Sequence, residues 1–300
     1  MISKVIAEKG LPAWAQAAPL ALVFALFFLV PLLLTIVVSF WNYTEYEILP
    51  DLTARNYIEA FEGCARRLLA ASPELCTTLK TYLTTLRISL TVWLITLVLG
   101  FAIAYFLAFH VRSLTVQIVL FLICTIPFWT SNVIRMISWI PLLGRNGLIN
   151  QALIKMHAVN EPVEWLLFSD FAVILAFVHL YTLFMIVPIC NSMMRIDRSL
   201  LEAAYDAGAT GWQTLTNVVI PLSKPGIVIG SIFVLTIVMG DFVTVGVMGG
   251  QQIASVGKMI NTQMGALQFP PAAAHAVILL ATVLTIVWGL TRLVDIRKEL

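Results

Sequence analysis

The sequence predicts an all-α membrane protein with six transmembrane helices. Hydrophobic residues make up 60% of the 300 residues, charged residues only 11%, and the mean hydropathy is +0.94. A soluble globular domain carries about 25% charged residues, so this composition is typical of an integral membrane protein. The apolar stretches are continuous and do not alternate with a period of two, which excludes a transmembrane β-barrel.

Uncharged runs locate the six candidate spans, because a bilayer-spanning helix needs about 20 apolar residues. The fifth run is short, but the chain continues without charge from Phe242 to Gly257, so we expect a span once Asp241 is accommodated. The first run ends without a small-residue cleavage site, and we therefore expect it to stay in the protein. The six runs are 17–40, 88–109, 113–134, 171–194, 225–240 and 259–291.

The segment before the first span, residues 1–16, mixes apolar residues with Lys4, Glu8 and Lys9. This mixture favours a short amphipathic helix lying on the inner leaflet, with a role in anchoring. Residues 17–300 then form one transmembrane domain.

The distribution of basic residues sets the expected orientation. The face that carries both termini has nine Lys and Arg residues in its short segments, whereas the longer segments of the opposite face have seven. The positive-inside rule therefore predicts a multi-pass protein with both termini in the cytoplasm.

Two of the four cysteines, Cys64 and Cys76, share the long first loop, residues 41–82. On the extracytoplasmic side such a pair can form a lasting disulfide. The alternative is that the two thiols are unrelated. Cys124 and Cys190 lie inside spans, where we expect inert packing residues.

No catalytic, nucleotide or metal site is visible, and we expect no cofactor. The stretch ending in Gly257, Lys258 and Met259 lacks the first glycine of a phosphate-binding loop and has Met where Ser or Thr must bind magnesium. The four histidines are scattered without the spacing of metal ligands. The net charge of +2 without a basic run argues against a nucleic-acid partner.

The loop 197–221, between the fourth and fifth spans, predicts a helix-turn-helix on the cytoplasmic face. Residues 198–207 are good helix formers, with Asp197 or Ser199 as the N-cap and with Gly208 and Gly211 suited to end the helix. A second short helix is expected from Trp212, before two prolines, Pro221 and Pro225, mark the start of the fifth span.

Small side chains on the first of these helices, Ala203, Ala204 and Ala207, leave a flat face that a partner backbone can approach, and Leu200, Leu201 and Tyr205 supply apolar anchors. Docking to a partner and packing against the chain's own bundle both remain open from these residues alone.

The spacing in this loop resembles the EAA loop of the permeases of ATP-binding-cassette (ABC) importers, whose pattern is EAA-x3-G-x9-I-x-L-P. Here Val218 and Ile220 stand in place of the usual Ile and Leu. The resemblance implies a type I importer permease fold in the bacterial inner membrane, with ATP hydrolysed by a separate ATPase dimer. It also implies a second permease subunit, a periplasmic substrate-binding protein and a small-molecule substrate. The residues it assigns to ATPase coupling are Glu202, Ala203, Ala204, Gly208 and Pro221.

Three further stretches resemble the spermidine/putrescine branch of these permeases: 127–135, 201–226 and 240–250. A polyamine or related cationic solute is the cargo that this resemblance implies. Permeases for an opine, an amino-acid derivative, thiamine or ferric ion are the alternatives within the family. An ion-coupled secondary transporter is the alternative outside it, although such a protein has no need of a docking loop.

Asp241 is the acidic residue that lies deep within a predicted span, where an unpaired charge costs at least about 2.5 kcal/mol. Glycines on both sides allow the helix to break there, as transporter helices do around substrate. We therefore expect Asp241 to meet a cationic substrate, with aromatic faces from Trp129, Phe128 and Tyr181 along the same path. The alternatives are that Asp241 caps a helix fragment or pairs with Arg135.

Overall fold

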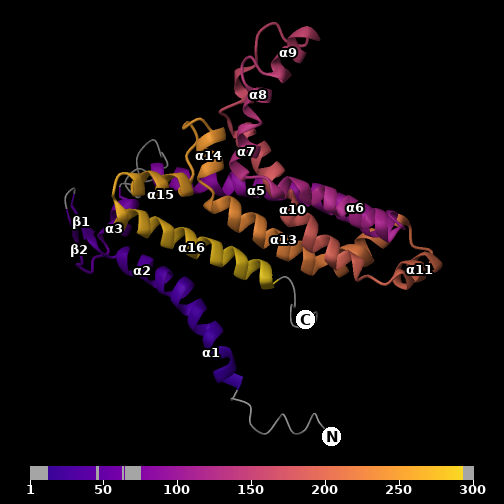
Figure 1. The fold of residues 1–300 in the computed structure, drawn as a ribbon, viewed down its shortest axis with the longest axis horizontal. Helices are drawn as coiled ribbons and strands as arrows, with labels where there is room; N and C mark the ends of the chain where they lie inside the picture. The colour runs from indigo at the N-terminus through magenta and orange to yellow at the C-terminus, as the bar shows by residue number, and fades with distance from the viewer. Residues whose placement is uncertain (1–12, 45–46, 63, 65–75, 293–300) are drawn as a thin grey trace.

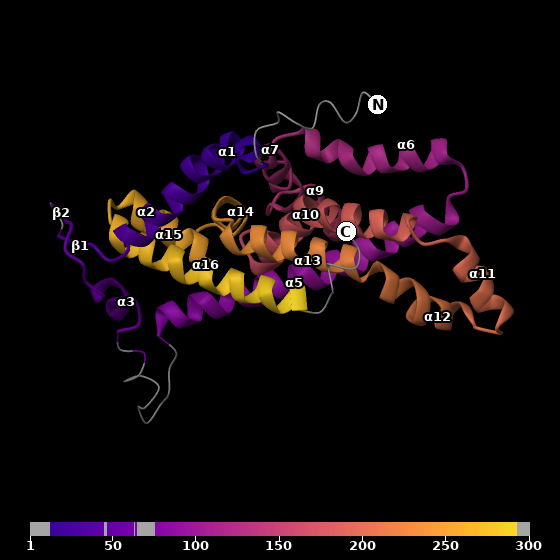
Figure 2. The same ribbon diagram turned by 90° about the horizontal axis from the view of Figure 1, so that it is seen from below.

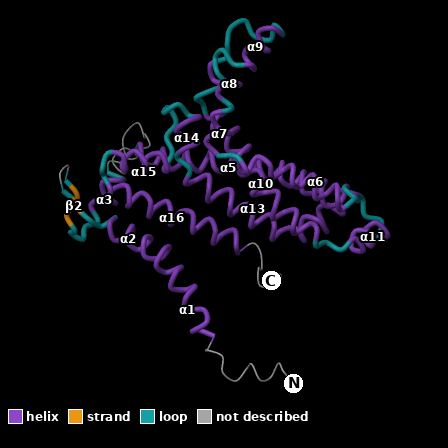
Figure 3. Tube along the Cα trace, in the orientation of Figure 1, coloured by secondary structure: helices purple, strands orange, loops and turns teal. Residues whose placement is uncertain are grey.

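The computed structural model describes residues 13–44, 47–62, 64 and 76–292, and this part of the chain is almost wholly helical (Figures 1 and 3). Five of its helices are long and apolar enough to cross a membrane, and a bent helix pair makes a sixth span. The predicted six-span all-α fold is confirmed. The predicted amphipathic segment lies, up to residue 12, outside the described residues.

Four helices lie side by side and form the central bundle (Figures 1 and 2). They are α5 (Thr77–Tyr105), α10 (Asp170–Met194), α13 (Ile220–Gly240) and α16 (Phe269–Arg292). α10 lies at the centre of the packing, because it contacts both α5 and α13 along much of its length. Fully buried side chains such as Phe177, Met185 and Ile189 come from α10 and form the core.

Small residues allow α10 and α13 to approach closely. A Cβ atom added to Gly226 of α13 would lie 2.3 Å from the carbonyl oxygen of Pro188 in α10, and one added to Gly230 would lie 2.7 Å from the sulfur of Met185. Close backbone approach at small residues is how membrane helices gain packing energy without a hydrophobic driving force.

The first span leaves the bundle at an angle (Figure 1). It consists of α1 (Ala13–Phe24), a π-helical turn (Ala25–Leu29) and α2 (Val30–Val38), and α2 packs against α16. Its apolar side chains are exposed, so lipid or another subunit must cover them.

A small substructure follows the first span. Two short antiparallel strands, β1 (Asn42–Tyr43) and β2 (Ile48–Leu49), precede α3 (Arg55–Ala60), which packs against α16. Buried Asn56 ties α3 to the end of the first span, since its amide donates to the carbonyl oxygens of Ser39 at 2.9 Å and Trp41 at 2.8 Å.

The third span, expected over 113–134, is bent and divided between two helices. α5 ends in a π-helical turn, Phe106–His110, after which α6 (Leu114–Thr125) runs along the outside of the bundle (Figure 2) and continues as a 3₁₀ turn, Ile126–Trp129. The next helix, α7 (Asn132–Ile137), begins after a break and the chain turns by 92°. Pro127 explains the change, because it lacks an N–H and its ring clashes with the preceding helical turn.

An arm projects from the bundle beyond α7 (Figure 1). It contains α8 (Ile140–Leu143), α9 (Leu148–Lys155) and a 3₁₀ turn, Glu164–Leu166, before the chain returns to α10.

The loop after α10 contains α11 (Arg198–Asp206), at the far end of the bundle from α15 (Figure 1), followed by α12 (Gly211–Thr214). α12 does not end before the fifth span, as the prediction of a separate short helix had it. It continues through a π-helical turn, Leu215–Val219, into α13, so one unbroken helix runs from Gly211 to Gly240. The wide π turn and the position of Pro221 in the first turn of α13 allow the proline to be accommodated without a break.

The fifth and sixth predicted spans each differ from the prediction, because each is divided into two helices. The fifth span ends at Gly240, and α14 (Val243–Met248) follows Asp241 as a separate short helix. The sixth run forms α15 (Val256–Gly265) and α16, separated by a turn in front of Pro270. α15 is attached to α5, since the amide of Val256 donates to the Thr85 hydroxyl at 2.9 Å.

Candidate functional site

The first candidate site is α11, whose start is fixed by Asp197. The Asp197 carboxylate accepts a hydrogen bond from the amide of Ser199 at 3.0 Å, which identifies Asp197 rather than Ser199 as the N-cap. The hydrogen bond from the Ser199 backbone lowers the pKa of Asp197 below its ordinary value. The cap is therefore ionised at neutral pH and is lost only under acid conditions.

The end of α11 is fixed by Gly208, which has a φ of 81°. The amide of Gly208 donates to the carbonyl of Tyr205 and that of Ala209 donates to the carbonyl of Ala204, both at 2.9 Å. These two bonds form a Schellman motif, which requires a left-handed residue where glycine has no steric cost. Gly211 has no such role, because it is the first residue of α12.

The second helix begins with a capping box. The Thr210 hydroxyl accepts from the amide of Gln213 at 3.3 Å, and the Gln213 side chain accepts from the amide of Thr210 at 2.8 Å. Local hydrogen bonds thus fix both ends of α11 and the start of α12.

The predicted coupling residues line an exposed surface of α11. Glu202 and Ala203 are exposed and Ala204 is half-buried, and no residue in the described part of the chain pairs with the Glu202 carboxylate. Leu201 alone on this helix packs against the core cluster. Pro221 lies apart from them, half-buried in the first turn of α13.

The second candidate site surrounds Asp241, where α13 ends. One carboxylate oxygen, Oδ2, accepts from the hydroxyls of Tyr181 at 2.6 Å and Thr244 at 2.7 Å. The other, Oδ1, accepts from the amide of Thr244 at 2.9 Å. Three neutral donors therefore hold the carboxylate, and no cation among the described residues forms an ion pair with it.

Asp241 was expected to meet a substrate, to cap a helix fragment or to pair with Arg135, and its contacts distinguish the last two roles. The residue caps α14, because it accepts the backbone N–H of Thr244 three positions on. It also breaks the fifth span instead of lying within it, and it lies level with Tyr181 near the middle of α10. The structure contains no ion pair between Asp241 and Arg135 within the described residues.

Aromatic rings extend from the Asp241 site. Phe184 lies at the centre of the cluster, with ring centroids 6.1 Å from Tyr181, 6.0 Å from Phe233 and 5.0 Å from Phe128. Trp129 is not part of this cluster, because its side chain is 78% exposed. The structure thus brings Phe128, Tyr181 and Asp241 together and leaves Trp129 outside.

A groove continues from these rings toward α11. It has a volume of about 610 Å³ and lies between α10 and α13, with Phe233 at the aromatic end and with Asp197 and Leu200 at the α11 end. Most of its lining is apolar, and Asn191, Ser192 and Arg195 supply polar groups. The groove therefore reaches from Phe233, whose ring lies beside Phe184, to the start of α11, and Asp241 itself is not among its lining residues.

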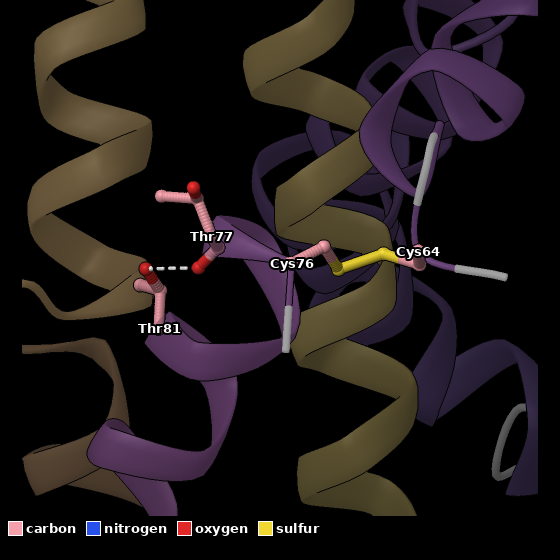
Figure 4. The surroundings of a disulfide bond; sticks show 4 residues. All are labelled: Cys64, Cys76, Thr77 and Thr81. Carbon is pink, nitrogen blue, oxygen red and sulfur yellow. Dashed lines mark hydrogen bonds between the residues drawn. A yellow bond between two sulfur atoms is a disulfide. The ribbon is translucent and has the colours of Figure 1, made fainter. Parts of the chain in front are cut away.

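At the opposite end of the bundle, Cys64 and Cys76 are joined by a disulfide with a Cα–Cα distance of 4.9 Å (Figure 4). Cys76 is the N-cap residue of α5, and the Thr81 hydroxyl donates to the carbonyl of Thr77 in the next turn at 2.9 Å. The disulfide thus attaches the segment after α3 directly to the start of α5.

Some residues of the site were not predicted from the sequence. Thr244 holds both carboxylate oxygens of Asp241, and its position three residues later is the spacing of an N-cap, a signal that was available. Phe184 and Phe233 carried no such signal, because aromatic residues in an apolar span are indistinguishable from ordinary packing residues.

Comparison with known proteins places the chain among transport proteins. A family model described as "Binding-protein-dependent transport system inner membrane component" matches residues 96–299. The spermidine/putrescine transport system permease protein PotB of Escherichia coli (strain K12) is 32% identical over 72% of this chain and 78% of its own length. PotB of Haemophilus influenzae is 29% identical over 95% of this chain and 97% of its own.

Solved structures agree on the fold. A bacterial ABC transporter involved in the import of the acidic polysaccharide alginate has a chain with a TM-score of 0.69 and 18% sequence identity, and the match covers 93% of both chains. A second structure of an alginate ABC transporter, in complex with an alginate-bound periplasmic protein, matches with the same TM-score. At this identity the likeness concerns the fold alone.

Proposed function

This chain belongs to the family of inner membrane components of binding-protein-dependent transport systems, and on that premise we propose that it carries a polyamine-like cation past Asp241 and along the groove between α10 and α13. It is a multi-pass inner-membrane permease subunit of an ABC importer. The family describes a membrane component and not the ATPase.

An ATPase dimer is the proposed partner of α11. The helix lies at the tip of the bundle, is stabilised by its own caps and exposes Glu202 and Ala203. A surface of this kind can accept a partner without rearrangement of the core. We assign coupling to Glu202, Ala203, Ala204 and Gly208, with Pro221 at the start of the helix that transmits the movement.

A second permease subunit, identical or homologous, is proposed to close the other side of the path. The groove is lined by α10, α13 and the start of α11, and no other described helix of this chain covers it. The first span and the arm extend away from the bundle and offer surface for such a partner (Figure 1).

The proposed orientation places α11 and both termini in the cytoplasm and the disulfide in the periplasm, where it is stable. The two features lie at opposite ends of the bundle, as this orientation requires. A periplasmic substrate-binding protein would then deliver cargo at the disulfide end, as the family name implies.

The observation that carries the cargo proposal is the carboxylate of Asp241, held by three neutral donors beside a cluster of aromatic rings. A cationic amine complements this arrangement through the carboxylate charge and the ring faces. PotB of E. coli is named for spermidine and putrescine, and both are amines. The solved neighbours are named for an acidic polysaccharide, which this carboxylate would repel.

Isolation of the binding protein with its ligand tests the proposal. The complete transporter would be purified with its binding protein, and the ligand identified by native mass spectrometry. We expect a polyamine or another small cation. An acidic oligosaccharide or another anion would contradict the cargo proposal while leaving the permease assignment intact.

A further inference from the structure

A second charged residue lies near the Asp241 site with its hydrogen-bonding capacity largely unused. Arg135 of α7 is only 6% exposed, and its Nε and Nη1 atoms have no hydrogen-bond partner among the described residues. Its Nη2 donates to the side chain of Asn132, a neutral group. A buried guanidinium without an anion is destabilising, so a partner at some stage of the transport cycle is expected.

A ring holds Arg135 in the observed position. The guanidinium carbon lies 5.2 Å from the centroid of Phe128, a cation–π contact, and Phe128 in turn packs edge-on against Phe184. Such a contact offsets part of the cost of burying the charge. It does not neutralise the charge.

The packing of α7 limits which anion can reach Arg135. α7 contacts α8, α10 and α14. Along these helices and their caps, the described carboxylates are Asp170, which forms an ion pair with Arg87, and Asp241, which caps α14 and has no cation. Asp241 is therefore the anion whose charge complements that of Arg135.

Both charged residues lie beside breaks in the chain. α7 follows the 92° bend after Trp129, and α14 is a six-residue helix between Asp241 and the glycines Gly249 and Gly250. A Cβ atom at Gly240, just before Asp241, would meet nothing within 4 Å. Short helices next to such breaks can change position without disturbing the long helices of the bundle.

We propose that Arg135 competes with the cationic cargo for Asp241 and takes its place when the cargo leaves the path. In this structure Arg135 contacts Phe128 and Asn132, and Asp241 is half-buried and has no ion-pair partner among the described residues. When α7 and α14 approach each other, the guanidinium pairs with the carboxylate and the amine is released. The inference rests on the proposed transport of a cation.

Equilibrium binding of labelled putrescine to the complete transporter in nanodiscs tests this competition. Arg135→Gln removes the competitor, so we expect the Kd for putrescine to fall about tenfold, which corresponds to the loss of one charge pair. Uptake by the same variant slows because the cargo is no longer displaced. Arg135→Lys retains the charge and should restore most of the native Kd, and Arg145→Gln, on the exposed arm, is the matched control.

A double-mutant cycle with Asp241→Asn separates competition from a structural role. Without the carboxylate there is nothing to compete for, so Arg135→Gln should leave the Kd of the Asp241→Asn protein unchanged. Equal effects of Arg135→Gln in both backgrounds would overturn the inference. If Asp241→Asn itself left putrescine binding unchanged, the proposed cation path would fail as well, and the two failures are thus distinguishable.

A second variant covers the case in which Arg135→Gln does not assemble. Asn132→Ala removes the acceptor that holds Arg135 in its resting position and keeps every charge. We expect a Kd about threefold higher, because the guanidinium is then freer to reach Asp241, and no change in the Asp241→Asn background. A Kd equal to the native value with Asp241 present would also overturn the proposal.

Discussion

The two ends of the helix that runs from Gly211 to Gly240 hold their functional residues in different ways. At one end, α11 is fixed by bonds between neighbours in the sequence, from Asp197 to Ser199 and from Gly208 back to Tyr205. At the other end, Asp241 is held by Tyr181, sixty residues away along the chain, on another helix of the core.

The two ends also differ in the role proposed for them. We call the end at α11 the docking end and the end at Asp241 the binding end. If an ATPase binds the exposed surface of α11 as proposed, substitutions there should leave folding intact and remove the response to ATP. Asp241 is half-buried and is held by a residue of the core helix α10, and if it meets a cationic cargo as proposed, substitutions there should change affinity. The four tests below take the two ends in turn, from the largest expected effect to the smallest.

Charge reversal at the docking end should abolish transport. Glu202→Lys reverses the charge at an exposed position of α11, so the protein should remain in the membrane at normal levels. Uptake and substrate-stimulated ATP hydrolysis should fall to background. Glu161→Lys, an exposed glutamate outside α11, is the control, and normal uptake by Glu202→Lys would refute the coupling assignment.

Neutralising the binding end should weaken uptake without affecting assembly. Asp241→Asn keeps the shape of the side chain and removes its charge, so we expect about tenfold weaker uptake of putrescine with the ATPase still bound. Asp170→Asn loses the same charge at an exposed ion pair with Arg87 and should have little effect. Equal uptake by native protein and Asp241→Asn would show that the carboxylate does not meet the cargo.

The glycines of the coupling loop provide a finer comparison. Gly208→Ala forces an alanine into a left-handed conformation at a cost of about 1 kcal/mol, so coupling should weaken roughly fivefold as α11 loses its end. Gly208→Asn should be tolerated better, because asparagine adopts this conformation more readily. Gly211→Ala has open space and an ordinary φ and should be silent in ATPase and uptake assays; equal effects at both glycines would contradict the Schellman role.

The last test asks on which side of the membrane the disulfide lies, and its substitutions should have the smallest effect on transport. With Cys124 and Cys190 replaced by Ala, the remaining pair should resist alkylation in intact cells until a reductant is added, and then react with a membrane-impermeant maleimide. Labelling before reduction would contradict the disulfide. Labelling only by a membrane-permeant reagent would show that the orientation is opposite to the proposed one.

The sequence predicted the docking end more fully than the binding end. The helix from Arg198, its cap and the role of Gly208 depend on local spacing, which one chain displays directly. The six apolar runs also sufficed for the fold class. The bend after Trp129 and the division of the sixth run both occur near prolines, but their angle and extent depend on tertiary packing.

The binding end depends on contacts between distant segments. Nothing near Tyr181 in the sequence indicates that its hydroxyl reaches Asp241, and nothing near Gly226 and Gly230 indicates that α10 is the helix they approach. The exposure of Trp129 likewise could not be predicted, because the uncharged run 113–134 has no polar face that would indicate which side chains point outward.

The unbroken helix from Gly211 to Gly240 also restricts how this chain can vary in length. Its 30 residues span about 45 Å and fix the angular position of Asp241 relative to the coupling loop. One inserted residue would turn one end against the other by about 100° and aim the carboxylate at a different neighbour. Side chains along this helix can therefore diverge widely between related permeases. Insertions and deletions are expected to accumulate instead in loops such as 251–255, where an added residue does not rotate Asp241 relative to the loop 197–221.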